Sequence, residues 1–181
     1  LDEVNVPDPG DGEVLIKVQA TPINPSDLGL LVGPADVSSL KEVEKGSVVE
    51  MKVPDGLIRS VAARFDQNLP VGNEGSGIVE SAGKGAEHLM GKTVGLAGGA
   101  MYSEYRCVPA SSCLVMNDGT TAEQAASCFV NPLTALGMVE TMRMENHTGL
   151  VHTAAASNLG QMLIKICLAA VSYTHLTLPT R

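Results

Sequence analysis

The fold of this chain is decided by the stretch Gly149-Leu150-Val151-His152-Thr153-Ala154-Ala155-Ala156-Ser157-Asn158-Leu159-Gly160-Gln161. Its pattern predicts a short apolar strand at 150–153, a turn of very small residues, and a helix over 160–170. Small side chains let a backbone approach a phosphate closely, and a helix N-terminus offers free N–H groups and a partial positive charge. The stretch therefore predicts the first βα unit of a dinucleotide-binding domain.

The turn matches the usual G-x-G-x-x-G fingerprint only in part. When the sequence is aligned on Gly160, the first two glycine positions hold Ala155 and Ser157. The retained Gly160 permits close packing of helix and strand, and Ala or Ser is tolerated where the turn needs no positive φ. The candidate cofactor-binding residues of this turn are Ala155, Ser157, Asn158, Leu159 and Gly160.

The part of the chain before this turn is rich in short strand signals. Period-two patterns and Gly-rich turns predict strands at 13–20, 76–83, 92–97 and 102–108, which together favour a small β-barrel. The stretch 35–70 is less regular and carries mixed charge, so we interpret it as an insertion or surface excursion.

Helix signals follow the strands. Thr121 and Gln124 have the spacing of a capping box and predict a helix over 122–129. Pro132 suits the first turn of a second helix that runs to about Met142. A complete dinucleotide-binding domain needs several more βα units than the remaining chain can form, so we expect the chain to be a fragment.

The last residues, 171–181, do not continue this pattern. Pro179 falls inside a possible strand, and three threonines occur without an apolar core pattern. The segment resembles translated adapter read-through at the end of a shotgun-assembled gene. We interpret 171–181 as foreign to the protein and exclude it from the fold.

Composition predicts a cytoplasmic globular protein. Hydrophobic residues make up 44% of the chain and charged residues 18%, and the formal net charge of −8 argues against nucleic acid or an anionic membrane surface as the main partner. Four cysteines lie at 107, 113, 128 and 167 without a C-x-x-C spacing, which indicates reduced thiols. The sequence shows no basic, apolar leader and no apolar run of the ~20 residues that a membrane span needs.

Four motifs in order resemble a known superfamily. They are Val18-Gln19-Ala20-Thr21-Pro22-Ile23-Asn24-Pro25-Ser26-Asp27, then Val71-Gly72-Asn73-Glu74-Gly75-Ser76-Gly77-Ile78-Val79, then Phe129-Val130-Asn131-Pro132-Leu133-Thr134-Ala135, and then the small-residue turn. Their order and spacing resemble the medium-chain dehydrogenase/reductase superfamily, in its zinc-free quinone oxidoreductase and 2-enoyl thioester reductase branch. The resemblance covers about residues 1–170.

The resemblance implies an α/β fold with a β-barrel and a dinucleotide cofactor. Residues 1–120 would form a GroES-like catalytic (substrate) domain, and 121–170 would form the linking helices and the first βα unit of a Rossmann domain. NADPH (or NADH) would bind in the cleft between the two domains.

The resemblance also implies that no metal is bound. In the zinc enzymes of the superfamily a Cys stands at the position of Asn24 and a His at that of Asn73, and the third ligand position near Phe129 is not a ligand here either. Zinc needs three or four converging Cys, His or carboxylate donors. We therefore expect no metal ligand and no zinc.

The candidate catalytic residue is Asn24, as a polar group near the nicotinamide. The alternative is that Asn24 and Asp27 simply cap the turn after the first strand, and both roles can hold together. Thr134 begins a helix where relatives contact the cofactor, and its alternative is a plain helix residue. The enoyl thioester reductases carry a proton-donating Tyr soon after the first motif, but residues 30–35 hold none.

The function implied for the full-length parent is NAD(P)H-dependent transfer of hydride to a quinone or an α,β-unsaturated carbonyl. The alternative is a non-catalytic superfamily member with a binding or structural role. The parent is expected to act on small molecules as a homodimer in the cytoplasm, without nucleic acid or membrane partners. The fragment itself is expected to be inactive.

Overall fold

The computed structural model describes residues 3–170, and the segment 171–181 that we interpret as foreign lies outside the described residues. The chain forms two compact units, an N-terminal unit over Leu1–Ala126 and a C-terminal unit over Ser127–Arg181. Among the described helices, none is both long enough and apolar enough to span a membrane.

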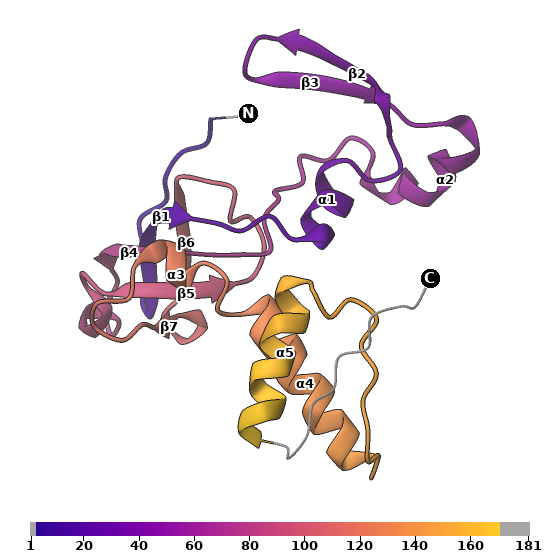
Figure 1. Ribbon diagram of the computed structural model, residues 1–181. Helices are drawn as coiled ribbons and strands as arrows, with labels where there is room; N and C mark the ends of the chain where they lie inside the picture. The colour runs from indigo at the N-terminus through magenta and orange to yellow at the C-terminus, as the bar shows by residue number, and fades with distance from the viewer. Residues whose placement is uncertain (1–2, 171–181) are drawn as a thin grey trace. The chain divides into compact units, whose positions relative to one another are not determined.

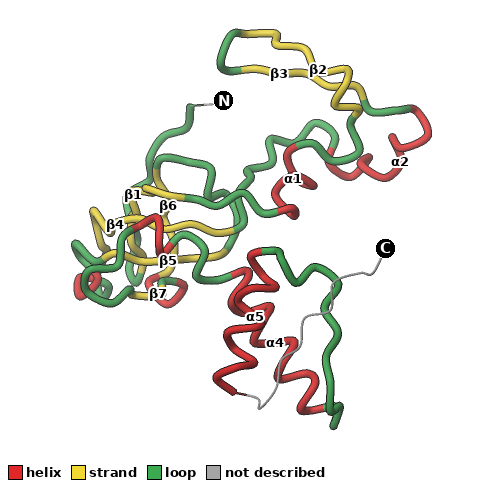
Figure 2. Tube along the Cα trace, viewed as in Figure 1, coloured by secondary structure: helices red, strands yellow, loops and turns green. Residues whose placement is uncertain are grey.

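The N-terminal unit is built on a five-stranded antiparallel sheet with the strand order β6-β1-β4-β5-β7 (Figures 1 and 2). Its strands are β1 (Glu13–Ala20), β4 (Glu74–Ala82), β5 (Thr93–Ala97), β6 (Tyr105–Pro109) and β7 (Leu114–Val115). The four strands predicted at 13–20, 76–83, 92–97 and 102–108 are thereby confirmed, with small shifts at their ends.

Alternation along the strands places one set of side chains in a core. Val14 and Ile16 of β1 are fully buried, and Leu15 between them is less buried. The rest of this core is aliphatic or thioether in character: Val79, Ala86, Leu89, Val94, Leu96, Met101 and Val108. No aromatic ring belongs to this buried cluster.

The N-terminal unit also contains short helices. Helix α1 (Pro25–Leu31) follows β1 after a loop of residues 21–24, and α3 (Ala122–Ala125) contacts β1, β4 and β5. The hydroxyl of buried Ser76 on β4 donates a hydrogen bond to the carbonyl of Ala122, which anchors α3 to the sheet. The predicted Thr121–Gln124 capping box is present, but α3 ends at Ala125 rather than at Phe129.

The stretch predicted as a surface excursion contains a separate hairpin. Strands β2 (Asp36–Glu44) and β3 (Val48–Lys52) pair as a two-stranded antiparallel sheet. A short helix α2 (Ile58–Val61) follows, flanked by 3₁₀ turns at Asp55–Leu57 and Ala62–Arg64. Nearly all residues of the hairpin are exposed, as an excursion requires.

The C-terminal unit is a pair of helices in its described part. Helix α4 (Val130–Met144), with Pro132 in its first turn, packs against α5 (Asn158–Ala170) through Ala135, Val139 and Leu163. The strand predicted at 150–153 is wrong, since no strand follows β7 within the described residues. A strand needs a neighbouring strand to hydrogen-bond its backbone, and the described part of this unit offers none.

Candidate functional site

A buried polar network lies at the C-terminal end of β1, where the first and second motifs meet. Asn24, Asp27 and Glu74 are 6%, 0% and 1% exposed. Asn24 directly precedes α1, Asp27 lies in the first turn of α1, and Glu74 begins β4. Buried polar groups need partners, and the contacts among these residues provide them.

The Asp27 carboxylate joins the two motifs through backbone amides. The amide of Asn24 donates to one Asp27 oxygen at 2.8 Å, and the amide of Asn73 donates to the other oxygen at 2.8 Å. The first bond caps the N-terminus of α1, where acidic groups are favoured. The capping role that the sequence predicts for Asp27 is therefore present, and the same carboxylate also fixes the loop before β4.

The Asn24 side chain is held by the second motif. Its Nδ2 donates to Glu74 Oε1 at 2.9 Å, a buried bond to a carboxylate of the kind that is stronger than a neutral one. Asn73 makes a parallel contact, since its Nδ2 donates to Ser26 Oγ at 2.8 Å. The side chains of Asn24 and Asn73 thus both make ordered hydrogen bonds.

Glu74 of this network and the neighbouring Tyr102 are not among the candidate residues predicted from sequence. Glu74 lies inside the second motif, where a carboxylate within an apolar, Gly-rich strand is a signal for a buried partner. Tyr102 has no such signal, because it comes from a distant loop. Its hydroxyl donates to the carbonyl of Pro22 at 3.1 Å.

Tyr102 gives the N-terminal unit a predicted pH dependence. The pKa of the Tyr102 phenol is raised above its ordinary value of 10.0. The larger cause is burial, and the second is the negative charge of Asp27. The neutral phenol is therefore favoured in the folded state, so its contribution to stability is complete below the unfolded pKa and is lost as pH rises through the folded pKa.

We expect the free energy of unfolding to fall more steeply above pH 10.0 in the wild-type chain than in Tyr102→Phe. Urea unfolding at pH values on both sides of this point measures the two slopes. In Tyr102→Phe the lost hydrogen bond to Pro22 lowers the free energy of unfolding by a constant amount at every pH below 10.0. Because the phenol is gone, its ionisation no longer contributes to the pH slope. Equal slopes in the two proteins would contradict the assignment.

The donor set of this network does not suit a zinc ion. Asn24 and Asn73 present amides, which are not among the Cys, His and carboxylate donors that zinc prefers. The nearby carboxylates of Asp27 and Glu74 already accept hydrogen bonds from Asn24 and Asn73. Within residues 3–170, no three His, Cys, Asp or Glu side chains are grouped so that they could hold a metal.

The small-residue turn has features that suit a phosphate. Ser157 precedes α5 and caps it, since its Oγ accepts the Gly160 amide at 3.0 Å. A Cβ at Gly160 would lie 2.5 Å from the Ala155 carbonyl oxygen, so only glycine fits there. In the described part of the chain, the amides of Asn158 and Leu159 have no acceptor, as is usual for the first turn of a helix.

Thr134 lies on the exposed side of α4. Its Oγ1 donates to the Val130 carbonyl at 2.6 Å, a contact that any threonine inside a helix can make. The hydroxyl oxygen keeps its capacity to accept a bond. The geometry of Thr134 is therefore that of a plain helix residue. A contact between Thr134 and the cofactor stays a prediction.

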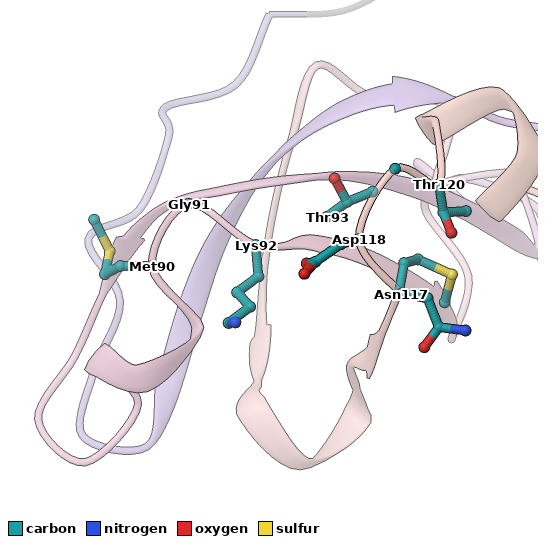
Figure 3. Close-up of a pocket in the computed structure, with 9 residues that line it drawn as sticks. Met90, Gly91, Lys92, Thr93, Asn117, Asp118 and Thr120 are labelled. Carbon is teal, nitrogen blue, oxygen red and sulfur yellow. The ribbon is translucent and has the colours of Figure 1, made fainter.

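A shallow hollow of about 220 Å³ lies elsewhere in the N-terminal unit (Figure 3). Lys92 and Thr93 line it together with the loop 116–120, which includes Asn117 and Asp118. None of the candidate site residues predicted from sequence lines this hollow.

Comparison with known proteins identifies the family. Residues 10–118 match the model of the alcohol dehydrogenase GroES-like domain, and this match covers more than half of the chain. The chain belongs to this family. The GroES-like match includes β1, α1, the hairpin, and strands β4 to β7.

One curated protein and two solved structures illustrate what the chain is similar to. The mitochondrial enoyl-[acyl-carrier-protein] reductase of Caenorhabditis elegans is 25% identical over 173 residues, which are 93% of this chain and 42% of that protein. A Mesorhizobium loti protein, provisionally named an NADPH:quinone reductase, is 30% identical, with a TM-score of 0.61 over 89% of this chain and 41% of its own. The Escherichia coli quinone oxidoreductase, solved with NADPH, is 21% identical, with a TM-score of 0.59 over 93% of this chain and 44% of its own.

These likenesses confirm the predicted superfamily and fold class. The chain is similar to enoyl reductases and NADPH:quinone reductases, as the four sequence motifs predict. Its fold is a GroES-like β-domain followed by the start of a Rossmann domain. The chain spans less than half the length of each of these relatives.

Proposed function

We propose that this chain supplies the substrate domain and the first cofactor-binding turn of a zinc-independent, NAD(P)H-dependent oxidoreductase. The complete protein transfers hydride from NADPH (or NADH) to a quinone or an α,β-unsaturated carbonyl. The observation that carries the proposal is the buried Asn24–Glu74 contact, which orders the amide of the candidate catalytic residue Asn24. Two hydrogen bonds support it, because Asp27 accepts from the backbone amides of Asn24 and Asn73 and so fixes both loops.

In this proposal the cofactor supplies the hydride and the protein supplies position and polarity. Asn24 contacts the nicotinamide or the substrate oxygen, with its amide plane fixed by Glu74. Ala155, Ser157, Asn158, Leu159 and Gly160 form the turn beneath the pyrophosphate, and Thr134 contacts the cofactor from α4. Zinc-independence rests on the donor chemistry of Asn24 and Asn73.

NADPH is favoured as the cofactor because the relative with 30% identity carries that cofactor in its name. The same relative and the enoyl reductase of Caenorhabditis elegans favour a small-molecule quinone or enoyl acceptor. We also propose that the complete protein is a cytoplasmic homodimer without nucleic acid or membrane partners, and that the 181-residue chain alone is inactive.

The test is NADPH oxidation by the complete protein, with quinones and enoyl thioesters as acceptors and with EDTA present. We expect turnover that EDTA does not reduce, and Asn24→Ala is expected to lower kcat by at least about tenfold because a positioned polar group is lost. Asn5→Ala, at an exposed position outside the network, serves as the matched control. Binding of NADPH without turnover of any acceptor would favour a non-catalytic role, and loss of activity in EDTA would refute zinc-independence.

A further inference from the structure

The β2–β3 hairpin lacks a packing partner within its own chain. Its two strands contact each other, and no other described element packs extensively on either of them (Figure 1). Five aliphatic side chains of the hairpin are 37% to 60% exposed: Val37, Leu40, Val43, Val48 and Val49. An isolated two-stranded hairpin is marginally stable in water, and a third strand or a packed face is what stabilises it.

The two outer edges of the hairpin differ in their regularity. Both irregularities of the β2–β3 register place extra residues on β2, between Asp36 and Lys41 and between Glu42 and Glu44. Bulged edges resist pairing with another strand, whereas a regular edge favours it. Strand β3 carries no bulge, so its outer edge is the one suited to pairing.

The backbone direction of β3 follows from one hydrogen bond. The amide of Lys52 donates to Ser39 Oγ on β2 at 2.8 Å, so it points into the hairpin. Backbone groups alternate along an antiparallel strand, which turns the amides and carbonyls of Val49 and Met51 toward the outer edge. Side chains alternate as well, so Val49 and Met51 share one face and Glu50 and Lys52 share the other.

We propose that β3 pairs antiparallel with β3 of a second copy of this chain, about a two-fold axis at Met51. This register places Met51 opposite Met51 of the second copy and Val49 opposite Val53, so one face of the joint is apolar. On the other face, Glu50 lies opposite Lys52 of the second copy, and Lys52 lies opposite its Glu50. Within the hairpin Glu50 lies opposite Lys41 and Lys52 lies opposite Asp36. Among residues 3–170 neither Glu50 nor Lys52 forms an ion pair.

The alternative edge is less complementary to itself. A two-fold pairing of β2 about Leu40 would bring Asp36 opposite Glu44 of the second copy, at both ends of the joint. Like charges directly opposite each other destabilise a pair of strands. Charge complementarity and edge regularity therefore select the same strand. The four-stranded sheet that results supplies the partner strands that the hairpin lacks.

The test uses two single charge reversals in the 181-residue chain. Glu50→Lys places Lys opposite Lys52 of the second copy, and Lys52→Glu places Glu opposite Glu50. Each reversal turns two attractive pairs per dimer into two repulsive pairs, so each is expected to weaken self-association at least about tenfold. Lys45→Glu, in the hairpin turn, makes the same change of net charge as Lys52→Glu away from this edge and serves as the matched control.

Mixing the two reversed chains separates the interface from effects within each hairpin. A Glu50→Lys chain and a Lys52→Glu chain complement each other across the two-fold joint, while the contacts inside each hairpin stay as they are in the separate variants. We expect sedimentation velocity to show dimers for the wild type, for Lys45→Glu and for the mixture, and monomers for each reversal alone. Far-ultraviolet circular dichroism checks that both variants remain folded.

Three results would overturn the proposal. They are a monomeric wild type, self-association that both reversals leave unchanged, and a mixture that fails to associate. The outcome does not depend on catalysis, so it stands apart from the test of the proposed oxidoreductase activity.

Discussion

Gly77→Ala is expected to lower the free energy of unfolding of the N-terminal unit by about 3 kcal/mol or more. Gly77 lies on β4, opposite Val18 of β1 and Val94 of β5, in the centre of the sheet. A Cβ at this position would overlap the backbone carbonyl of Lys17 and lie 2.9 Å from Ile16 Cγ2. Because the obstacle is the backbone of a paired strand, a rotamer change cannot relieve the clash.

Gly29→Ala provides the matched control for this substitution. Gly29 lies in α1, and an added Cβ would meet no atom within 4 Å. Alanine is favoured over glycine in a helix by roughly 0.5–1 kcal/mol, so this variant is expected to be unchanged or slightly more stable. Urea unfolding of both variants measures the difference. A Gly77→Ala chain as stable as Gly29→Ala would contradict the close approach of β1 and β4.

Asp27→Ala is expected to cost about 3 kcal/mol, since it leaves one buried and one part-buried backbone donor without an acceptor. The amides of Asn24 and Asn73 both donate to this carboxylate, and Asp27 is 0% exposed. The substitution also removes the cap of α1. The same urea titration, followed by circular dichroism, measures the loss.

Two further variants separate the contribution of the Asp27 carboxylate to stability from that of the neighbouring Ser26–Asn73 hydrogen bond. Asp27→Asn keeps one acceptor oxygen, so its loss of stability is expected to lie between those of the wild type and Asp27→Ala. Ser26→Ala removes only the exposed contact to Asn73 and is expected to change stability by less than about 0.5 kcal/mol. An Asp27→Ala chain that unfolds within about 1 kcal/mol of the wild type would show that other groups satisfy these amides.

The sequence predicts the elements whose signals are local. The alternation in 13–20 and the capping box at Thr121 both depend on neighbours within a few residues, and both are present in the structure. The strand at 150–153 depends on a partner strand that the described chain does not contain, so local pattern alone was an insufficient guide there.

In the candidate site, too, contacts between sequence neighbours can be predicted and contacts between distant residues cannot. The capping role of Asp27 is visible in the spacing of the first motif, because its contact with Asn24 is local. The contact between Asn24 and Glu74 joins residues 50 positions apart, and that of Tyr102 with Pro22 joins residues 80 positions apart. The first pairing depends on the register of β1 and β4, and the second on where the loop before β6 lies, neither of which one sequence reveals.

The chain has three tyrosines but no tryptophan, so its ultraviolet emission contains no indole band. The sequence contains no Trp, and the core residues are aliphatic or carry a thioether. A single indole introduced into either unit would therefore be the only such emitter in the molecule. The unfolding of Leu1–Ala126 and that of Ser127–Arg181 can thus be followed separately in one intact chain, without any chemical label.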